Sequence, residues 1–195
     1  MKLALFDMDR TLLAKETASL YVRYQREIGE ATTTDLLRTL GWVFRYTVGH
    51  LDMEKVAERV LRELEGTPEV AIALRCEDWF LSHVERHLTD DGRRAVAEHQ
   101  RSGDVCAIVT GASSYATRPL ARLLGIEHVV SSEFEVGPDG CFTGKPVLPL
   151  CLGEGKLLRA RRFAETLGAK LETATFYTDS HSDLPLLEAV GRPVV

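Results

Sequence analysis

The sequence predicts an α/β fold in which an open, doubly wound parallel sheet carries a helical insertion after its first strand. Three observations support this prediction. The apolar run LALF at residues 3–6 ends sharply at polar residues, as a buried parallel strand does. About 80 residues of mostly helical periodicity then separate it from the next strand signal. From residue 105 onward, short apolar runs alternate with amphipathic segments, which favours right-handed crossovers in one sheet.

The insertion is expected to be helical throughout. Helical periodicity covers four segments: 16–30, 33–48, 51–64 and 69–88. Aromatic residues at helical spacing, including Trp79 and Phe80, are expected to form the core of the insertion. His83 and His87 lie four residues apart but have no third ligand nearby, so we expect a solvated helix face there and no zinc site.

The remaining elements alternate between strand and helix. They are a strand at 105–110 followed by a turn, a helix at 115–125, an edge hairpin of strands at 128–136 and 141–144, a helix at 154–168, a strand at 174–179, a short helix at 183–191 and a last strand from 192. We therefore predict a Rossmann-like core formed by residues 1–14 and 92–195, and an inserted helical domain of residues 15–91.

Composition narrows the class of function. The chain has 195 residues and a net charge of -5, which argues against a protein that mainly coats nucleic acid or an anionic membrane. It contains no apolar run of about 20 residues and no signal peptide, so we expect no membrane span. Its four cysteines show no CxxC spacing, which favours a reducing, cytoplasmic location.

Polar residues follow the predicted strands at the points where the loops of a doubly wound sheet converge. These residues are Asp7 and Asp9 after the first strand, Thr110 and Gly111 after the second, and Asp179 and Asp183 after a later one. Carboxylates crowded in one crevice repel each other, so a cation is required. Because the potential ligands are all oxygen atoms, the sequence favours Mg²⁺ held by Asp7 and Asp179.

The other residues of this crevice suit a phosphate group. Lys156, the Thr110 hydroxyl and the backbone N–H groups at Gly111 are able to bind the oxygens of a transferring phosphoryl group. Asp7 and Asp9 are two residues apart at a strand end and therefore face the same side. One carboxylate can attack phosphorus while the other, kept protonated, protonates the leaving oxygen.

These residues carry a resemblance to a known family. FDMDRTLL resembles the DxDx[TV] nucleophile motif of the haloacid dehalogenase superfamily, VTGA its second motif, Lys156 its third and TDSHSD its fourth. The helical insertion directly after the first motif is similar to the type 1 cap of the phosphoserine-phosphatase-like branch. The resemblance covers the whole chain, and four motifs in the family's order make it specific.

The resemblance implies a Mg²⁺-dependent phosphatase with assigned roles for each motif residue. Asp7 would be the nucleophile, and Asp9 the general acid that later activates water. The metal would be bound by the side chains of Asp7 and Asp179 and by the main-chain carbonyl of Asp9. Thr110 and Lys156 would hold the phosphate, and Asp183 would support the metal and the lysine.

Two positions depart from the commonest motif pattern. Arg10 stands where a small residue such as glycine is frequent, and Thr178 stands where glycine usually precedes the fourth-motif acid. Neither replaces a catalytic group, and two roles for Arg10 remain open: it would narrow the entrance of the site or reach the substrate. Lys145 competes with Lys156 for the third-motif role, but Lys156 opens a helix about two dozen residues before Asp179, as in this branch.

The expected substrate is a small phosphorylated metabolite. Glu16, nine residues after Asp7, matches a glutamate that phosphoserine phosphatases place near the substrate's amino group, although it also suits the start of a helix. Arg59 lies near their carboxylate-binding arginine, one residue out of register, and Met53 replaces a usual phenylalanine. Phosphoserine, histidinol phosphate and phosphoethanolamine therefore all remain open.

Two other functions fit the same residues. The phosphoryl group of an aspartyl-phosphate can pass to an alcohol, which would make the protein a phosphotransferase or mutase. A regulator that binds a phosphorylated metabolite without hydrolysing it is disfavoured because Asp7, Asp9, Lys156 and Asp179 are all present. The sequence does not predict the oligomeric state.

Overall fold

A six-stranded sheet forms the centre of the computed structural model, which describes residues 1–30 and 53–195. The strand order is β4-β3-β2-β1-β5-β6, and neighbouring strands are parallel except for the antiparallel pair β3 and β4. The strands are β1 (Leu3–Phe6), β2 (Val105–Ser113), β3 (His128–Val136), β4 (Phe142–Val147), β5 (Thr175–Tyr177) and β6 (Arg192–Val194). The predicted doubly wound α/β fold is confirmed, including the hairpin at the sheet edge.

Both faces of the central strands are buried, which explains their continuous apolar sequence. Ala4 and Phe6 of β1 pack into the core on one face, whereas Leu3 and Leu5 pack into the core on the other. Strand β2 alternates in the same way. Strand β1 therefore lies buried between two apolar layers. Its packing on both faces holds the backbone of the next residue, Asp7, in place.

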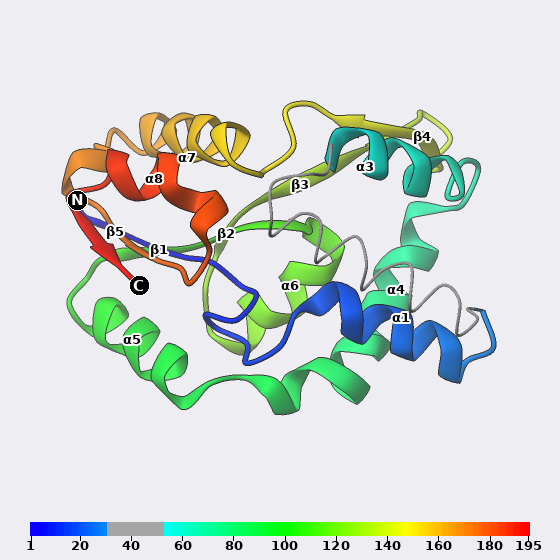
Figure 1. Ribbon diagram of the computed structural model, residues 1–195, viewed down its shortest axis with the longest axis horizontal. Coiled ribbons are helices and arrows are strands. Elements are labelled where there is room, and N and C mark those ends of the chain that lie inside the picture. Colours follow the sequence, from blue (N-terminus) through cyan, green and yellow to red (C-terminus); the bar gives the residue numbers. More distant parts are fainter. Residues whose placement is uncertain (31–52) are drawn as a thin grey trace.

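Helices cover both faces of the sheet, as Figure 1 shows. On one face lie α7 (Glu154–Thr166) and α8 (Leu184–Ala189), and on the other α5 (Asp90–Arg101) and α6 (Ser114–Leu123). Helix α5 is not among the sequence-predicted elements. The Thr89 side chain caps it by accepting a hydrogen bond from the Gly92 N–H at 3.1 Å, and Asp90 and Asp91 favour its first turn.

The described part of the insertion is mostly helical, with connecting turns and isolated β-bridges at Pro68 and Leu88. It contains α1 (Thr17–Glu27), α3 (Met53–Arg62) and α4 (Glu69–Trp79), followed by a π-helical turn at Phe80–Val84 and a 3₁₀ turn at Glu85–His87. The predicted helix at 33–48 lies outside the described residues. Trp79 and Phe80 are buried in the core, as predicted.

The prediction of a solvated helix face at His83 is wrong. This side chain is buried, and its ring nitrogens lie 2.9 Å from the Glu27 carboxylate and 2.7 Å from the Ser82 hydroxyl. Its ring also packs edge-on against Tyr24. His83 therefore joins α1 to the π-helical turn, a long-range pairing that helical periodicity alone does not reveal.

Two predicted strand ends also differ from the structure. Strand β2 continues through Ser113, where a turn is predicted after Thr110, and its pairing with β3 shifts register between Val109 and Ser113. Strand β5 ends at Tyr177, so Asp179 lies in the loop beyond the strand instead of at its last residue. In both cases the pattern of apolar residues does not predict where the strand ends, because polar residues continue β2 and follow β5.

The insertion is joined to the sheet by backbone hydrogen bonds at β4. The N–H of Gly66 donates to the Phe142 carbonyl at 2.9 Å, and the N–H of Phe142 donates to the Thr67 carbonyl at 3.0 Å. The division into a core of residues 1–14 and 92–195 and an insertion of 15–91 stays a prediction. Within residues 1–30 and 53–195, none of the helices is long and apolar enough to cross a membrane.

Replacement of Gly155 with alanine is expected to destabilise the start of α7, just before Lys156. A Cβ atom there would lie 2.1 Å from the Leu150 carbonyl oxygen. Because this oxygen belongs to the backbone, relieving the clash requires a backbone shift that costs free energy. We expect G155A to lower the free energy of unfolding by about 2 kcal/mol in urea titrations. G137A is the control, because its new Cβ would crowd the end of the Asp139 side chain, whereas the nearest backbone atom, the Cys141 carbonyl oxygen, lies at an ordinary contact distance of 3.6 Å. Equal stability of the two variants would contradict this account.

Candidate active site

A buried lysine joins two carboxylates at the centre of the predicted site. The Lys156 ammonium donates to Asp7 Oδ1 at 2.9 Å and to Asp183 Oδ2 at 2.6 Å. The exposed fractions of Asp7, Lys156 and Asp183 are 6%, 3% and 1%. These residues come from the end of β1, the first turn of α7 and the 3₁₀ turn His181–Asp183 before α8. Asp7 and Lys156 are 149 positions apart in the sequence, and Lys156 and Asp183 are 27 apart, so the structure links parts of three of the predicted motifs.

Charge and burial compete in this triad. Burial opposes the charged form of Lys156, but the carboxylates of Asp7 and Asp183 outweigh it and raise the pKa of the ammonium above its usual value. Burial raises the pKa of Asp7 to about 6, against the opposing effect of Lys156. Asp7 is therefore mainly ionised at neutral pH, and Lys156 carries the compensating charge.

Lys145, the competing lysine, is exposed on β4, whereas Lys156 is buried in the site. Local geometry at the start of α7 explains the position of Lys156. Gly153 precedes the helix with a positive φ of 50°, and the close approach of Gly155 to the Leu150 carbonyl leaves no room for a side chain.

Asp9 is held at the start of the first helix of the insertion. Its Oδ1 accepts a hydrogen bond from the Thr17 N–H and its Oδ2 accepts one from the Thr17 hydroxyl, both at 3.0 Å. Burial is the main cause that raises the pKa of Asp9 to about 7. Asp7 and Asp9 thus differ in their partners: an ammonium contacts the first, and neutral donors contact the second.

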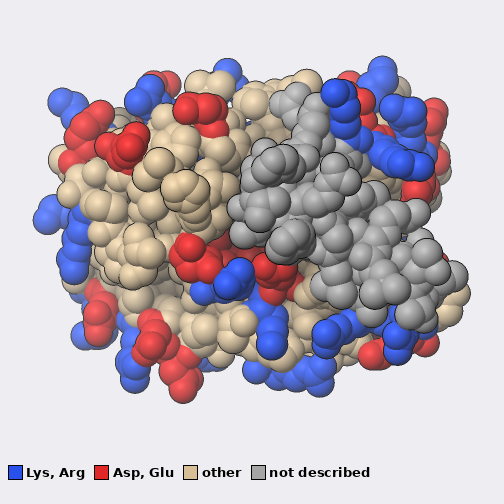
Figure 2. All heavy atoms as spheres, viewed as in Figure 1, with Lys and Arg blue, Asp and Glu red and all other residues tan. Residues whose placement is uncertain are grey.

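Arg10 lies between two acids at the exposed side of the site. Its Nε is 3.3 Å from Asp179 Oδ2 and its guanidinium is 3.4 Å from Glu16 Oε1. Its φ of 59° is a left-handed conformation that glycine adopts at less cost, which agrees with the small residues frequent at this motif position. Figure 2 shows acidic and basic side chains gathered over the region where Figure 1 places the loop after β1.

Thr110 and Gly111 lie within β2, next to β1. Thr110 is buried, and its hydroxyl accepts a hydrogen bond from the Ala112 N–H at 3.2 Å. A Cβ on Gly111 would lie 2.4 Å from a Leu152 side-chain carbon, so glycine allows the loop before α7 to approach β2. Arg59 is exposed on α3, which packs beside β4. Among the described residues, the structure does not bring Arg59 into contact with the other predicted site residues.

The donor set is suitable for Mg²⁺. Asp7 and Asp179 follow adjacent parallel strands, and the Asp7 N–H donates to the Tyr177 carbonyl at 2.8 Å, which ties the two segments together. Across residues 1–30 and 53–195 there is no cluster of three or more His, Cys, Asp or Glu side chains arranged for a metal. Mg²⁺ does not require one, because it commonly uses one or two carboxylates together with waters and phosphate oxygens. The two carboxylates and the Asp9 carbonyl fit that requirement.

Sequence reasoning missed two residues that contact the predicted site. Thr17 binds both carboxylate oxygens of Asp9, and Thr178 donates to Asp183 at 2.8 Å. The position of Thr17 at the start of a predicted helix is the sequence feature that could have identified the Thr17 contact. Thr178 was noted only as a departure from glycine, and its role depends on a contact with a side chain five residues later.

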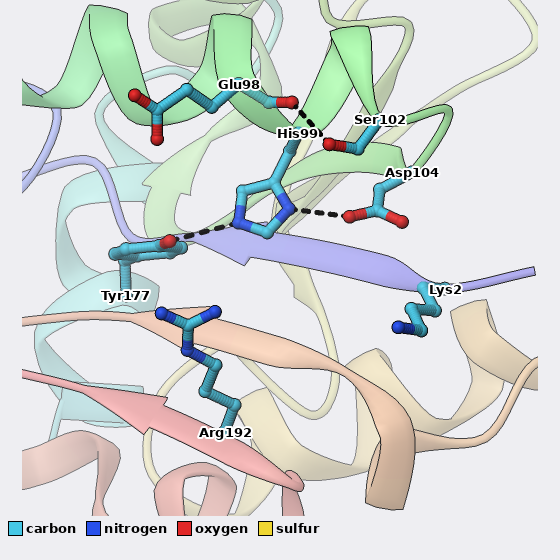
Figure 3. A pocket seen from close by; sticks show the side chains of 7 residues that line it. All are labelled: Lys2, Glu98, His99, Ser102, Asp104, Tyr177 and Arg192. Atoms are coloured by element: carbon cyan, nitrogen blue, oxygen red, sulfur yellow. Dashed lines mark hydrogen bonds and ion pairs between the residues drawn. The ribbon is translucent and has the colours of Figure 1, made fainter.

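A polar groove of about 430 Å³ lies elsewhere, beside the start of β1. Figure 3 shows His99 at its wall, with Nδ1 2.7 Å from Asp104 and Nε2 3.0 Å from the Tyr177 hydroxyl. Lys2 and Arg192 also line it, and none of the sequence-predicted site residues does. Because the His99 ring packs against Phe6 and Tyr177, its contacts stabilise the junction of α5 with the sheet.

Two phosphatases are similar in sequence to this chain over almost its whole length. Histidinol-phosphatase of Neisseria meningitidis is 27% identical over 98% of this chain and 88% of its own length. Phosphoserine phosphatase SerB2 of Mycobacterium tuberculosis is 29% identical over 97% of this chain and 42% of its own length. These two proteins share sequence with nearly the whole of this chain.

Solved structures show the same architecture. A protein of unknown function from Bordetella pertussis has a TM-score of 0.86 and 33% identity, over 98% of this chain and 88% of its own. A substrate-bound phosphoserine phosphatase has a TM-score of 0.67 at 23% identity, over 98% of this chain and 84% of its own, which indicates a shared fold. The haloacid dehalogenase-like hydrolase family matches residues 4–188, and the chain belongs to this family.

Proposed function

We propose that this protein is a Mg²⁺-dependent phosphatase that hydrolyses small phosphomonoesters through an aspartyl-phosphate at Asp7. The observation that carries the proposal is the buried triad in which Lys156 bridges Asp7 and Asp183. Burying three charged groups for stability alone is rarely favourable, because the cost of desolvating them cancels much of their electrostatic attraction. A nucleophilic carboxylate facing an anionic phosphate needs such a fixed positive charge beside it.

In the first step, the carboxylate of Asp7 attacks phosphorus and the bond from phosphorus to the ester oxygen breaks. Lys156 contacts Oδ1 of Asp7, so the lysine orients the carboxylate for this attack. The same ammonium, together with the Thr110 hydroxyl, is placed to offset charge on the phosphoryl oxygens. The product of this step is a phosphorylated Asp7 and a free alcohol.

Asp9 supplies and removes the proton. Its raised pKa, near 7, leaves a substantial protonated fraction at neutral pH, which suits a general acid for the leaving oxygen. After it has given up the proton, the Asp9 carboxylate is able to accept one from water as the water attacks the phosphorylated Asp7. Hydrolysis then releases phosphate and restores both carboxyl groups. The two hydrogen bonds from Thr17 orient Asp9 for these proton transfers.

Asp7 and Asp179, with the main-chain carbonyl of Asp9, would hold Mg²⁺. The ion would supply positive charge against the phosphate oxygens and reduce the repulsion between the carboxylates. Asp179 is suited to this role because its side chain is 37% exposed and its partner Arg10 is a surface cation whose side chain is 56% exposed. Asp183, in contrast, is buried, and its Oδ2 already accepts hydrogen bonds from Lys156 and Thr178.

We propose an amine-bearing phosphomonoester as the substrate class. Glu16 lies near the site through its contact with Arg10, and its carboxylate is partly exposed. The relatives named histidinol-phosphatase and phosphoserine phosphatase are consistent with such substrates. We also propose that residues 15–91 act as the cap over the site, and that the protein works in a reducing compartment, since all four of its cysteines are free.

Replacement of the nucleophile tests the reaction itself. Asn at position 7 keeps an oxygen acceptor for Lys156 but cannot attack phosphorus, so D7N is expected to fold and to lose at least about a thousandfold in kcat. The assay is phosphate release, with Mg²⁺, from p-nitrophenyl phosphate, phosphoserine, histidinol phosphate and phosphoethanolamine. D139N, in an exposed turn, is the matched control. Turnover in wild type no greater than in D7N would refute the proposed function.

Replacement of Asp9 tests the general acid through the leaving group. An alkoxide needs a proton as it leaves, whereas p-nitrophenolate is stable without one. We expect D9N to lower kcat/KM for phosphoethanolamine or phosphoserine by about 100-fold or more, and for p-nitrophenyl phosphate by a much smaller factor. Because kcat/KM ends at the first irreversible step, the later attack of water does not enter the comparison. An equal loss for both substrate types would exclude the acid role.

Mg²⁺ binding can be measured without turnover. Saturating Mg²⁺ should raise the melting temperature of the wild type, since a ligand at 100 times its Kd stabilises by about 2.7 kcal/mol. D179N should reduce this shift, whereas D139N should retain it. NaCl at equal ionic strength controls for general screening, and EDTA should abolish activity until Mg²⁺ is restored. A shift of the same size in D179N would remove Asp179 from the metal site.

A further inference from the structure

Thr178 occupies a buried position at the end of β5, next to the triad. It is 3% exposed, and its N–H donates to the Val194 carbonyl at 3.1 Å, which fixes its backbone to β6. Its side chain makes two further hydrogen bonds. The hydroxyl donates to Asp183 Oδ2 at 2.8 Å and accepts from the Ser180 N–H at 3.1 Å.

The direction of these bonds is fixed by chemistry. An amide N–H only donates, so the Thr178 oxygen accepts from Ser180, and its single proton is free for Asp183. Asp183 Oδ2 receives a second hydrogen bond from Lys156, whose ammonium also contacts Asp7. A continuous chain of hydrogen bonds therefore leads from Thr178 through Asp183 and Lys156 to the carboxylate proposed as the nucleophile.

We infer that Thr178 is a positioning residue for the reaction: its hydroxyl orients Asp183, which in turn holds Lys156 against Asp7. The inference rests on the proposed function. Glycine, frequent at this position of the motif, would supply no hydroxyl, so Asp183 would lose one of its two donors and the Ser180 N–H would lose its acceptor. Burial makes such losses costly, because water cannot replace the missing partner.

Thr178→Val removes the hydroxyl and keeps the branched shape of the side chain. We expect T178V to lower kcat by about tenfold or more, the range seen when outer-shell hydrogen bonds are removed, with a change in KM of less than about threefold. T178S restores a hydroxyl and should recover most of kcat. T175V is the matched control, since Thr175 is a buried threonine of β5, three residues before Thr178, and forms no hydrogen bond with Asp183. Melting temperatures measured for all variants separate unfolding from loss of catalysis.

A second readout requires no substrate. Lys156 is one of six lysines in the chain, so in protein labelled with ¹⁵N-lysine its buried ammonium can be assigned by comparison with K156R. T178V should shift this resonance and speed the exchange of its protons with water, whereas T178S and T175V should not. An inactive wild type would refute the proposed function, and the resonance would still report whether Thr178 holds Lys156. If T178V resembles T175V in both kcat and resonance, Thr178 is not a positioning residue.

Discussion

The ammonium of Lys156 is the interaction on which the site depends. It lies between Asp7 and Asp183, both almost fully buried, and burying charged groups is costly unless they are paired. Removing the lysine alone would leave two uncompensated acids in the core. The same contact ties the end of β1 to α7 and to the loop before α8, so the geometry of the proposed nucleophile and the packing of the sheet are set together.

Close backbone approaches make this contact possible. Glycine at position 155 lets the start of α7 pass the Leu150 carbonyl, and glycine at position 111 lets the same loop approach β2. A Cβ at position 155 would clash with the Leu150 carbonyl oxygen and push the start of α7, with Lys156, away from Asp7, whereas a Cβ at position 111 would meet the end of the Leu152 side chain. Gly155 therefore contributes to the site indirectly, since it determines how closely the lysine-bearing helix approaches the sheet.

The sequence predicts the sheet well because its central strands are buried on both faces and appear in the sequence as apolar runs. It also predicts the grouping of Asp7, Lys156 and Asp183, because loops at the carboxyl ends of parallel strands converge. It fails where a side chain depends on a partner far along the chain. His83 contacts Glu27 and is buried, and Thr17 donates to Asp9; no local sequence pattern predicts these two contacts. Helix α5 was missed for another reason, since its cap at Thr89 follows directly on a helical segment.

The charge balance of the site supports the proposal that a cation binds there. Within residues 1–30 and 53–195, the carboxylates of Asp7, Asp179, Asp183 and Glu16 are contacted by two cationic groups, those of Lys156 and Arg10. These described charges sum to a negative value, and Asp9 adds to it when it is ionised. A phosphate dianion entering such a region would be repelled. Because Lys156 is already committed to two acids, a divalent cation near Asp179 is the simplest means of making the site attractive to a phosphate ester.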